Sequence, residues 1–317
     1  MREVWSTTQD VLMRMAHDAR LRRLIEGKSV GHDVVRRYVA GESISSALDV
    51  TGELLVRGRL VSLTHLAADP LDATQAKDRR KRLRKLLRRL GQAGYSEGAR
   101  TEVSVRMRAL GAGLRPGGAP AALEHARLVA QTAAEVGTRL TVETENTLPI
   151  DVTLGAWREL RGEFPDTGIA LQAGLDRSAD DCRALAADGA RVRLGKGTAH
   201  GPGAITRPHD VDLAYVRCLK ILLHGGADVV VATHDLRLLR IAESLVAHLP
   251  EAERAGREIE YGLRYGVAPV TQTTVADRGD RMRVYVPFGE DWYPYLMSRI
   301  AEETNPVVSL VRAATAR

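Results

Sequence analysis

The stretch MRVYVPFGEDWYPYLMSRIAEE, residues 282–303, contains one complete strand–turn–helix unit. Within it, RVYVPF (283–288) alternates side chains at the two-residue period of a β-strand. Gly289 then breaks the strand, and a helical pattern covers residues 291–304. Five aromatic residues gather in this unit, although aromatics make up only 4% of the chain. We therefore expect it to carry part of a functional site as well as part of the fold.

Seven further runs with strand character precede this unit, at 60–66, 102–107, 139–145, 168–173, 191–196, 228–234 and 258–263. Each is followed by a turn and a segment with helical periodicity, at 72–92, 119–136, 152–162, 178–188, 208–224, 236–248 and, most weakly, 269–277. Eight such repeats over about 250 residues fit a closed barrel better than a doubly wound sheet. The predicted fold class is therefore α/β, a (β/α)8 TIM barrel with extra N-terminal helices. We expect residues 1–54 to form the N-terminal helical extension and residues 55–317 the catalytic barrel.

In a barrel of this kind, the active site lies at the C-terminal ends of the strands and in the loops that follow them. The polar side chains at those positions are His65, Arg106, Glu143, Glu145, Gln172, Lys196, Thr233, His234, Tyr261, Arg264 and Tyr285. The loop at 197–210 is long enough to act as a lid over this end, or it is a plain surface connection.

Composition restricts the cell compartment and the partners. The chain has no run of about 18 apolar residues and no apolar signal segment near its start, so we expect a cytoplasmic protein without a transmembrane segment. Peripheral contact with a membrane stays open. Cys182 and Cys218 are interpreted as reduced structural thiols.

The net charge of +6 and the basic run KDRRKRLRKLLRRL (77–90) raise the alternative of nucleic-acid binding. However, Leu83, Leu86, Leu87 and Leu90 follow the spacing of an amphipathic helix that packs on a core. The arginines would then form the solvated face of that helix, and we expect no nucleic-acid partner.

Three common kinds of site find no support in the sequence. In LGAGLRPGG (110–118), Pro116 and Gly117 break the spacing of a dinucleotide-binding loop. The histidines and acids are scattered over different strands without a paired metal-binding motif, so we expect no metal. No serine lies in a nucleophile elbow, which removes support for acyl transfer.

The last helix carries the clearest binding surface. Tyr295, Ser298, Arg299 and Glu302 fall at i, i+3, i+4 and i+7, and so share one face. Together with Tyr285, this face can hold an apolar ring by stacking and a carboxylate by a charge-assisted hydrogen bond. The alternative is an exposed helix with an ordinary Arg–Glu pair.

The segment VYVPFGEDWYPYLMSRIAE resembles the C-terminal motif of the flavin-dependent proline dehydrogenases. Further motifs resemble that family in the same order over roughly residues 50–305: SLTHLA, SVRMRALG, TVETENTLPIDVTL, IALQAGLDR, VRLGKG, DVDLAYVRCLKILL, VVATHD and IEYGLRYGV. The resemblance implies a distorted TIM barrel that holds FAD noncovalently at the C-terminal ends of its strands. It also implies oxidation of L-proline to Δ1-pyrroline-5-carboxylate, with a quinone or other electron acceptor reoxidising the flavin.

The resemblance also implies roles for individual residues. Lys196 would lie at the boundary between flavin and substrate, with Asp212 as a supporting acid. Cofactor contacts are expected from Arg106, Gln172, Lys196, Thr233, His234 and Arg264. Tyr285 and Tyr295 would pack on the substrate ring, Arg299 would bind its carboxylate, and Glu302 would orient that arginine.

The chain departs from the family pattern at four places. Ser298 replaces the first of two adjacent arginines, and Ala68 replaces the glutamate that pairs with it. Gly174 replaces a tyrosine, and Ala199 or His200 replaces another. Losing one carboxylate-binding arginine should cost about 1.5–3 kcal/mol, and the small residue at Gly174 should enlarge the site.

The sequence therefore predicts an FAD-dependent dehydrogenase of the proline dehydrogenase type, acting on L-proline or a proline derivative as a cyclic imino acid. The alternatives are a related dehydrogenase for a different cyclic amine, and a flavin-binding pseudoenzyme that serves as a scaffold.

Overall fold

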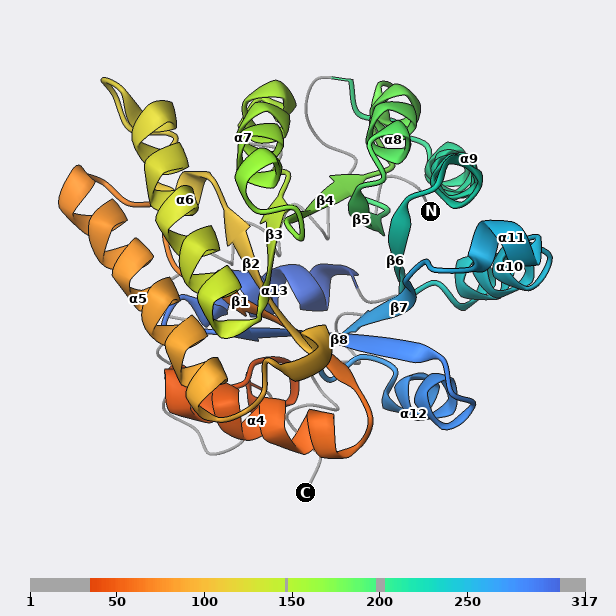
Figure 1. Cartoon of the computed structure of the whole chain (residues 1–317), viewed down its shortest axis with the longest axis horizontal. Coiled ribbons are helices and arrows are strands. Elements are labelled where there is room, and N and C mark those ends of the chain that lie inside the picture. Colours follow the sequence, from red (N-terminus) through yellow and green to blue (C-terminus); the bar gives the residue numbers. More distant parts are fainter. Residues whose placement is uncertain (1–34, 146–147, 198–202, 303–317) are drawn as a thin grey trace.

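The computed structural model describes residues 35–145, 148–197 and 203–302, with side chains up to Arg299. Eight parallel strands pair in sequence order, and the last closes on the first (Figure 1). This closed barrel confirms the predicted fold class. The strands are β1 (Leu60–His65), β2 (Thr101–Arg106), β3 (Arg139–Glu143), β4 (Gly168–Gln172), β5 (Arg191–Gly195), β6 (Asp228–Ala232), β7 (Ile259–Arg264) and β8 (Arg281–Phe288).

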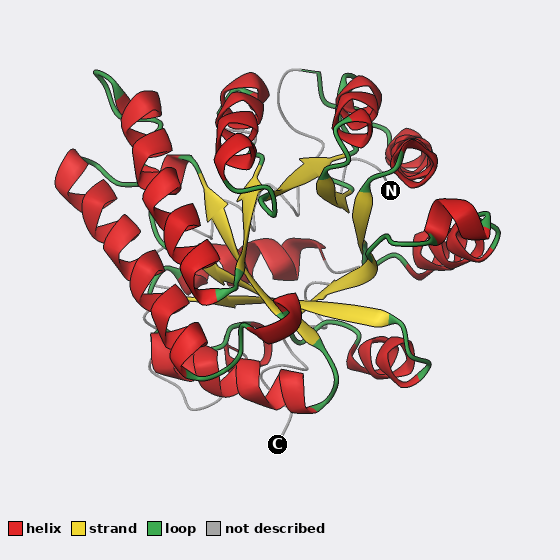
Figure 2. Cartoon of the chain, in the orientation of Figure 1, coloured by secondary structure: helices red, strands yellow, loops and turns green. Residues whose placement is uncertain are grey.

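Helices form a ring outside the strands, as Figure 2 shows. The main ones in the ring are α5 (Ala73–Gln92), α6 (Gly118–Val136), α7 (Ile150–Glu163), α8 (Ser178–Ala187), α9 (Pro208–Gly225), α10 (Leu236–Ala247) and α12 (Pro269–Asp277), whereas α13 (Trp292–Glu302) lies inside the ring in the view of Figure 1. A short helix, α11 (Glu251–Arg254), was not expected from the sequence. The weak pattern at 269–277 does form a helix, α12, with Pro269 in its first turn, where the missing N–H of proline costs nothing.

The helix before the first strand takes the outer position that a regular barrel gives to the helix after the last strand. Helix α4 (Ile44–Val56) precedes the barrel in sequence, yet it packs against β1 and β8. Helix α13 follows β8 and instead packs its Trp292, Leu296 and Met297 against Tyr38 and Val39. The predicted division into an N-terminal extension (1–54) and a barrel (55–317) stays a prediction: α4 crosses its boundary, and residues 1–34 lie outside the described part.

Charged side chains fill the lower interior of the barrel, which is the end where the strands begin, opposite the mouth. Apolar residues are usual there. Glu102 and Glu260 face Arg191 and Arg283 from four different strands, and all four are buried. Arg283 donates two hydrogen bonds to Glu260, and Arg191 donates to both glutamates at 3.0 Å. Burial alone would raise the pKa of Glu102, but Arg283, Arg191 and Arg193 outweigh it and lower the pKa to about 2. This charged layer replaces an apolar core inside the barrel, whereas the apolar core lies between strands and helices.

Helix α5 confirms part of the prediction for the basic run and corrects another part. Leu83, Leu86, Leu87 and Leu90 are buried against the core. However, Arg79 does not belong wholly to the solvated face, because its Nε is buried and its Nη2 donates to the Ala68 carbonyl at 3.1 Å. Arg82 stays on the solvated face, where it pairs with the exposed Glu290 at 3.0 Å.

Candidate active site

Lys196 follows β5 directly and is held by carboxylates from two other elements. Its ammonium lies 2.5 Å from Asp212 on α9 and 3.5 Å from Asp235, which caps α10. Arg237 contacts the same two acids, at 3.1 Å and 2.8 Å. The predicted pair of Lys196 and Asp212 therefore exists in the structure as an ion pair.

Tyr285 projects into the barrel and meets groups from β3 and β5. Its hydroxyl donates to Glu143 at 3.0 Å. Arg193 donates to the same Glu143 oxygen at 2.5 Å, and its guanidinium lies 5.0 Å from the centre of the Tyr285 ring. Burial first, and Glu143 second, raise the pKa of Tyr285 far above its usual range, so the phenol stays protonated and can donate.

The last helix brings its predicted face to this group. Tyr295 lies close enough to Tyr285 to affect its titration, and the Arg299 guanidinium lies 5.3 Å from the centre of the Tyr295 ring. Arg299 also donates to the Ser298 hydroxyl at 3.3 Å, and Ser298 itself donates to the Tyr295 carbonyl. The side chain of Glu302 lies outside the described part of the chain, so its predicted role stays a prediction.

Gln172, at the end of β4, packs against the main chain that follows β5. Its amide donates to the Thr144 carbonyl at 3.4 Å. Gly197 has a φ of +85°, and a Cβ there would lie 2.7 Å from the Gln172 side chain. Glycine favours both this backbone angle and this approach, so Gly197, the second glycine of VRLGKG, lets Gln172 pack against the main chain beside Lys196.

Thr233, His234 and Arg264 meet at the ends of β6 and β7. The Arg264 backbone N–H donates to His234 Nε2 at 3.0 Å, so that nitrogen carries a lone pair. Burial first, and the nearby Arg264 charge second, lower the pKa of His234 to about 3. The Thr233 hydroxyl accepts from the Asp235 backbone N–H at 3.2 Å. A neutral histidine and a positive arginine are therefore available at this part of the mouth.

Arg106 ends β2 on the opposite side of the mouth. It donates to the Ala67 carbonyl at 3.1 Å and lies 3.7 Å from the Glu145 carboxylate. Burial raises the pKa of Glu145 despite the attraction of Arg106. About a third of the Arg106 side chain is exposed, which leaves part of its guanidinium accessible from the mouth.

Sequence reasoning missed one central residue and misplaced another. Arg193 was not among the predicted site residues, although the alternation in RVRLGK places it on the same face of β5 as Arg191. Tyr261 was expected at the mouth but is buried on the outside of β7, where the Arg278 guanidinium lies 5.5 Å from its ring. The reason is again the period of two, since Glu260 occupies the inward face.

Comparison with known proteins identifies the family of this chain. A family model for proline dehydrogenase matches residues 204–312. The chain is 30% identical to proline dehydrogenase 1 of Bacillus subtilis over 269 residues, which covers 84% of this chain and 86% of the relative. It is 32% identical to a proline dehydrogenase of Deinococcus radiodurans over 288 residues, covering 88% and 89%. The chain belongs to the proline dehydrogenase family.

Members of the proline dehydrogenase family are oxidoreductases that act on CH–NH groups, and this chain is one of them. Its fold also matches a solved structure of proline utilization A from Bdellovibrio bacteriovorus, inactivated by N-propargylglycine. That match has a TM-score of 0.76 at 23% identity and covers 90% of this chain, which spans about a third (34%) of the solved chain.

The structure shows what occupies the positions where this family member departs from the pattern. The Ala68 carbonyl accepts from Arg79, and Ser298 bonds within α13. Directly beside Gly174 the space is taken by neighbouring residues, because a Cβ there would lie 2.9 Å from the Lys196 carbonyl and 3.6 Å from Val211; the enlarged site stays a prediction. Ala199 and His200 lie outside the described residues.

Within the described ranges, no helix is long and apolar enough to cross a membrane. In the same part of the chain, no three histidine, cysteine, aspartate or glutamate side chains are grouped closely enough to hold a metal ion.

Proposed function

We propose that this chain is an FAD-dependent dehydrogenase that oxidises L-proline, or a proline derivative, to a Δ1-pyrroline-5-carboxylate-type imine. The observation that carries the proposal is that the Arg299 guanidinium lies over the Tyr295 ring on α13, while the hydroxyl of Tyr285 on β8 is held by Glu143. It offers a cation for a carboxylate and two phenol rings for the faces or edge of a five-membered ring.

The polar groups around the mouth suit a flavin dinucleotide. Lys196, Arg264 and Arg106 supply positive charge at separate places around the mouth, while Gln172 and neutral His234 supply hydrogen-bonding groups for uncharged ring atoms. The described residues fit such a cofactor by the chemistry of their donors, and we assign these residues to FAD. When bound, FAD supplies the atom N5 that accepts the hydride.

The chain's own residues would position the substrate and keep its charges in place. Arg299 binds the carboxylate, and Tyr295 and Tyr285 enclose the ring, with the Tyr285 hydroxyl fixed by Glu143. The hydride would leave the ring carbon next to nitrogen with the electron pair that FAD would accept, and the nitrogen would release its proton to solvent water, which leaves the C=N bond. We expect a quinone or similar compound as the final acceptor of the two electrons.

A second candidate substrate is a different cyclic amine or imino acid. The observation in its favour is Ser298, whose hydroxyl bonds within α13 where the family pattern has a second carboxylate-binding arginine. Adding charge back with Ser298→Arg and Ala68→Glu together should lower the KM for free proline about tenfold. An unchanged KM would argue that this position does not set the substrate preference.

The main test is anaerobic reduction of the purified protein by a panel of cyclic amines. We expect the visible flavin absorbance to bleach with proline or a substituted proline, and not with pyrrolidine, which lacks the carboxylate. Arg299→Gln should raise the KM about tenfold or more. Arg254→Gln, exposed on α11, is the matched control and should change nothing. A colourless protein, or equal reduction by pyrrolidine, would contradict the proposal.

A further inference from the structure

Lys196, Asp212, Asp235 and Arg237 form a group of four alternating charges at the mouth, beside the ends of β5 and β6. One Asp212 oxygen lies 2.5 Å from the Lys196 ammonium, and the other lies 3.1 Å from the Arg237 guanidinium. One Asp235 oxygen lies 3.5 Å from Lys196 and 2.8 Å from Arg237. Each carboxylate therefore contacts both cations, and the two positive charges balance the two negative ones. The proposed mechanism gives no role to Asp235 or Arg237.

Asp235 is anchored by its position at the start of α10. Its carboxylate accepts from the Arg237 backbone N–H at 3.0 Å, and its own backbone N–H donates to the Thr233 hydroxyl at 3.2 Å. The Arg237 side chain adds hydrogen bonds at 2.8 Å and 3.3 Å. These side-chain bonds, more than the charge of Lys196, lower the pKa of Asp235 to about 2. Asp235 is therefore ionised at neutral pH, so Lys196 meets a second carboxylate from the neighbouring strand end.

Arg237 contacts both acids although it lies largely in solvent. Its side chain is 77% exposed, whereas those of Asp212 and Asp235 are 18% and 20% exposed. Without Arg237, the Lys196 ammonium alone would face two carboxylates, which would leave the group with an excess of one negative charge. Such a charge repels an anionic ligand such as FAD, which carries two phosphate groups.

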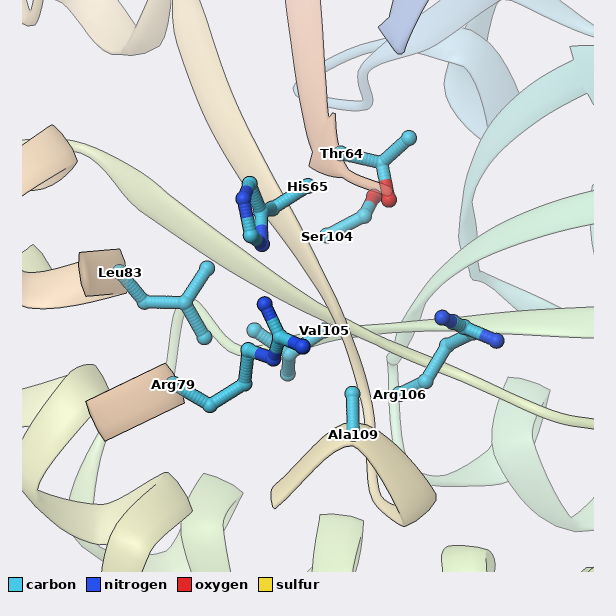
Figure 3. Close-up of a pocket in the computed structure, with 8 residues that line it drawn as sticks. All are labelled: Thr64, His65, Arg79, Leu83, Ser104, Val105, Arg106 and Ala109. Carbon is cyan, nitrogen blue, oxygen red and sulfur yellow. The ribbon is translucent and has the colours of Figure 1, made fainter. Parts of the chain in front are cut away.

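The cation on the opposite side of the mouth is arranged differently. Figure 3 shows Arg106 extending away from His65 and Arg79. Its guanidinium lies 3.7 Å from the Glu145 carboxylate. Lys196, by contrast, contacts two acids that a second cation also contacts. The additional acid and cation at Lys196 therefore contribute contacts without adding net charge.

We propose that Asp235 and Arg237 are positioning residues that act through Lys196. Asp235 directs the ammonium from the β6 side, and Arg237 offsets the negative charge of the two acids. Lys196 then stays available to the anionic part of FAD. This inference rests on the proposed binding of FAD.

Titration of the flavin-free protein with FAD, followed by flavin fluorescence, tests the role of charge. Arg237→Gln leaves one uncompensated negative charge and should weaken FAD affinity about tenfold. Asp235→Asn combined with Arg237→Gln restores neutrality, and asparagine also caps a helix. This double variant should bind FAD within about threefold of the wild type. Arg240→Gln removes an exposed cation from the same helix and should leave the affinity unchanged.

The double variant separates an effect of charge from a merely structural role. If the Asp235–Arg237 pair only stabilises the start of α10, the double variant should bind FAD at least as weakly as Arg237→Gln. That result, or an unchanged affinity in Arg237→Gln, would overturn the proposal.

A second measurement does not require flavin. Acetic anhydride acylates a lysine only while its amine is unprotonated, and mass spectrometry of the peptides gives the rate at Lys196. Asp235→Asn removes one carboxylate beside the ammonium and should raise this rate about threefold, whereas Arg237→Gln should lower it by a similar factor. Lys220, exposed on α9, is the internal control.

Equal acylation rates at Lys196 in the wild type and both single variants would overturn the proposal even if FAD binds. A protein that binds no FAD would contradict the proposed function, whereas the acylation rates would still test how Lys196 is positioned. The two proposals therefore fail separately.

Discussion

The lower interior and the mouth of the barrel contain the same kinds of residue in different states. Below, Arg283 is 1% exposed, and Glu260 takes two of its hydrogen bonds. Above, Lys196 and Arg106 are about one-third exposed and keep part of their surface accessible. Charges that satisfy one another stabilise the barrel, whereas charges with remaining capacity can bind a ligand. Exposure and hydrogen-bond pairing therefore distinguish cations that stabilise the barrel from cations that can bind a ligand, which residue type alone does not.

The largest expected effect comes from breaking the lower layer. Glu260→Gln would leave Arg283, Arg191 and Arg281 without their shared carboxylate. Removing one partner of a buried ion pair typically costs about 3–5 kcal/mol. We expect the free energy of unfolding, measured by urea denaturation and circular dichroism, to fall by about this amount. Glu251→Gln, exposed on α11, is the control; a similar small change in both variants would contradict the structural role of the layer.

The two regions should lose their contributions to the free energy of unfolding in different pH ranges. The mouth histidines His65 and His234 have pKa values of about 3 in the folded protein and about 6.5 in the unfolded chain. As the pH falls below about 6.5, the unfolded chain binds protons that the folded protein does not, so stability is lost. Each contributes a slope of about 1.4 kcal/mol per pH unit in this window. Glu102, with its pKa lowered to about 2, contributes stability that is lost only between about pH 4.5 and 2.

Urea denaturation at several pH values measures these slopes. His234→Gln should reduce the slope between pH 6.5 and 4.5 and leave the loss at lower pH in place. A slope that His234→Gln leaves unchanged would show that this histidine is not held neutral in the folded protein.

A smaller effect on stability, but a clear one on activity, is expected at Tyr285. Tyr285→Phe removes the hydrogen bond to Glu143, and we expect the rate of flavin reduction to fall about tenfold. The free energy of unfolding should change by less than about 1 kcal/mol. Tyr261→Phe, on the outside of the neighbouring strand, should affect neither quantity. Equal losses of activity in the two variants would remove Tyr285 from the site.

The smallest effect is expected on the solvated face of α5. Lys77→Gln combined with Lys85→Gln should change the free energy of unfolding by less than about 0.5 kcal/mol, because both side chains are exposed. Binding of DNA that weakens steeply with salt in the wild type, and is lost in this variant, would revive the nucleic-acid alternative. Fluorescence anisotropy with labelled DNA at two salt concentrations measures this.

Most of the fold could be predicted from sequence because strand and helix periods are local properties. Even α12 was predicted with its bounds. The pairs that make the site are not local: Glu143 and Tyr285 are 142 positions apart, and no spacing rule connects them. Arg79 was predicted to be solvated because helical periodicity gives the direction of the Cα–Cβ bond, not the position of the guanidinium at the end of a long side chain. The space beside Gly174 depends on a neighbouring main chain, which sequence reasoning could not place.

Gly289 lies between β8 and α13, beside the pair of strands that closes the barrel. Gly289 has a φ of +132°, a Cβ there would collide with the Leu66 carbonyl, and its N–H donates to the Gly41 carbonyl at 2.9 Å. Beside it, the Leu66 N–H donates to the Phe288 carbonyl at 2.7 Å. The contact between β1 and β8 thus also fixes the start of α13. If β1 and β8 separate locally, as hydrogen exchange of their amides would detect, the Arg299 guanidinium on α13 would move with them.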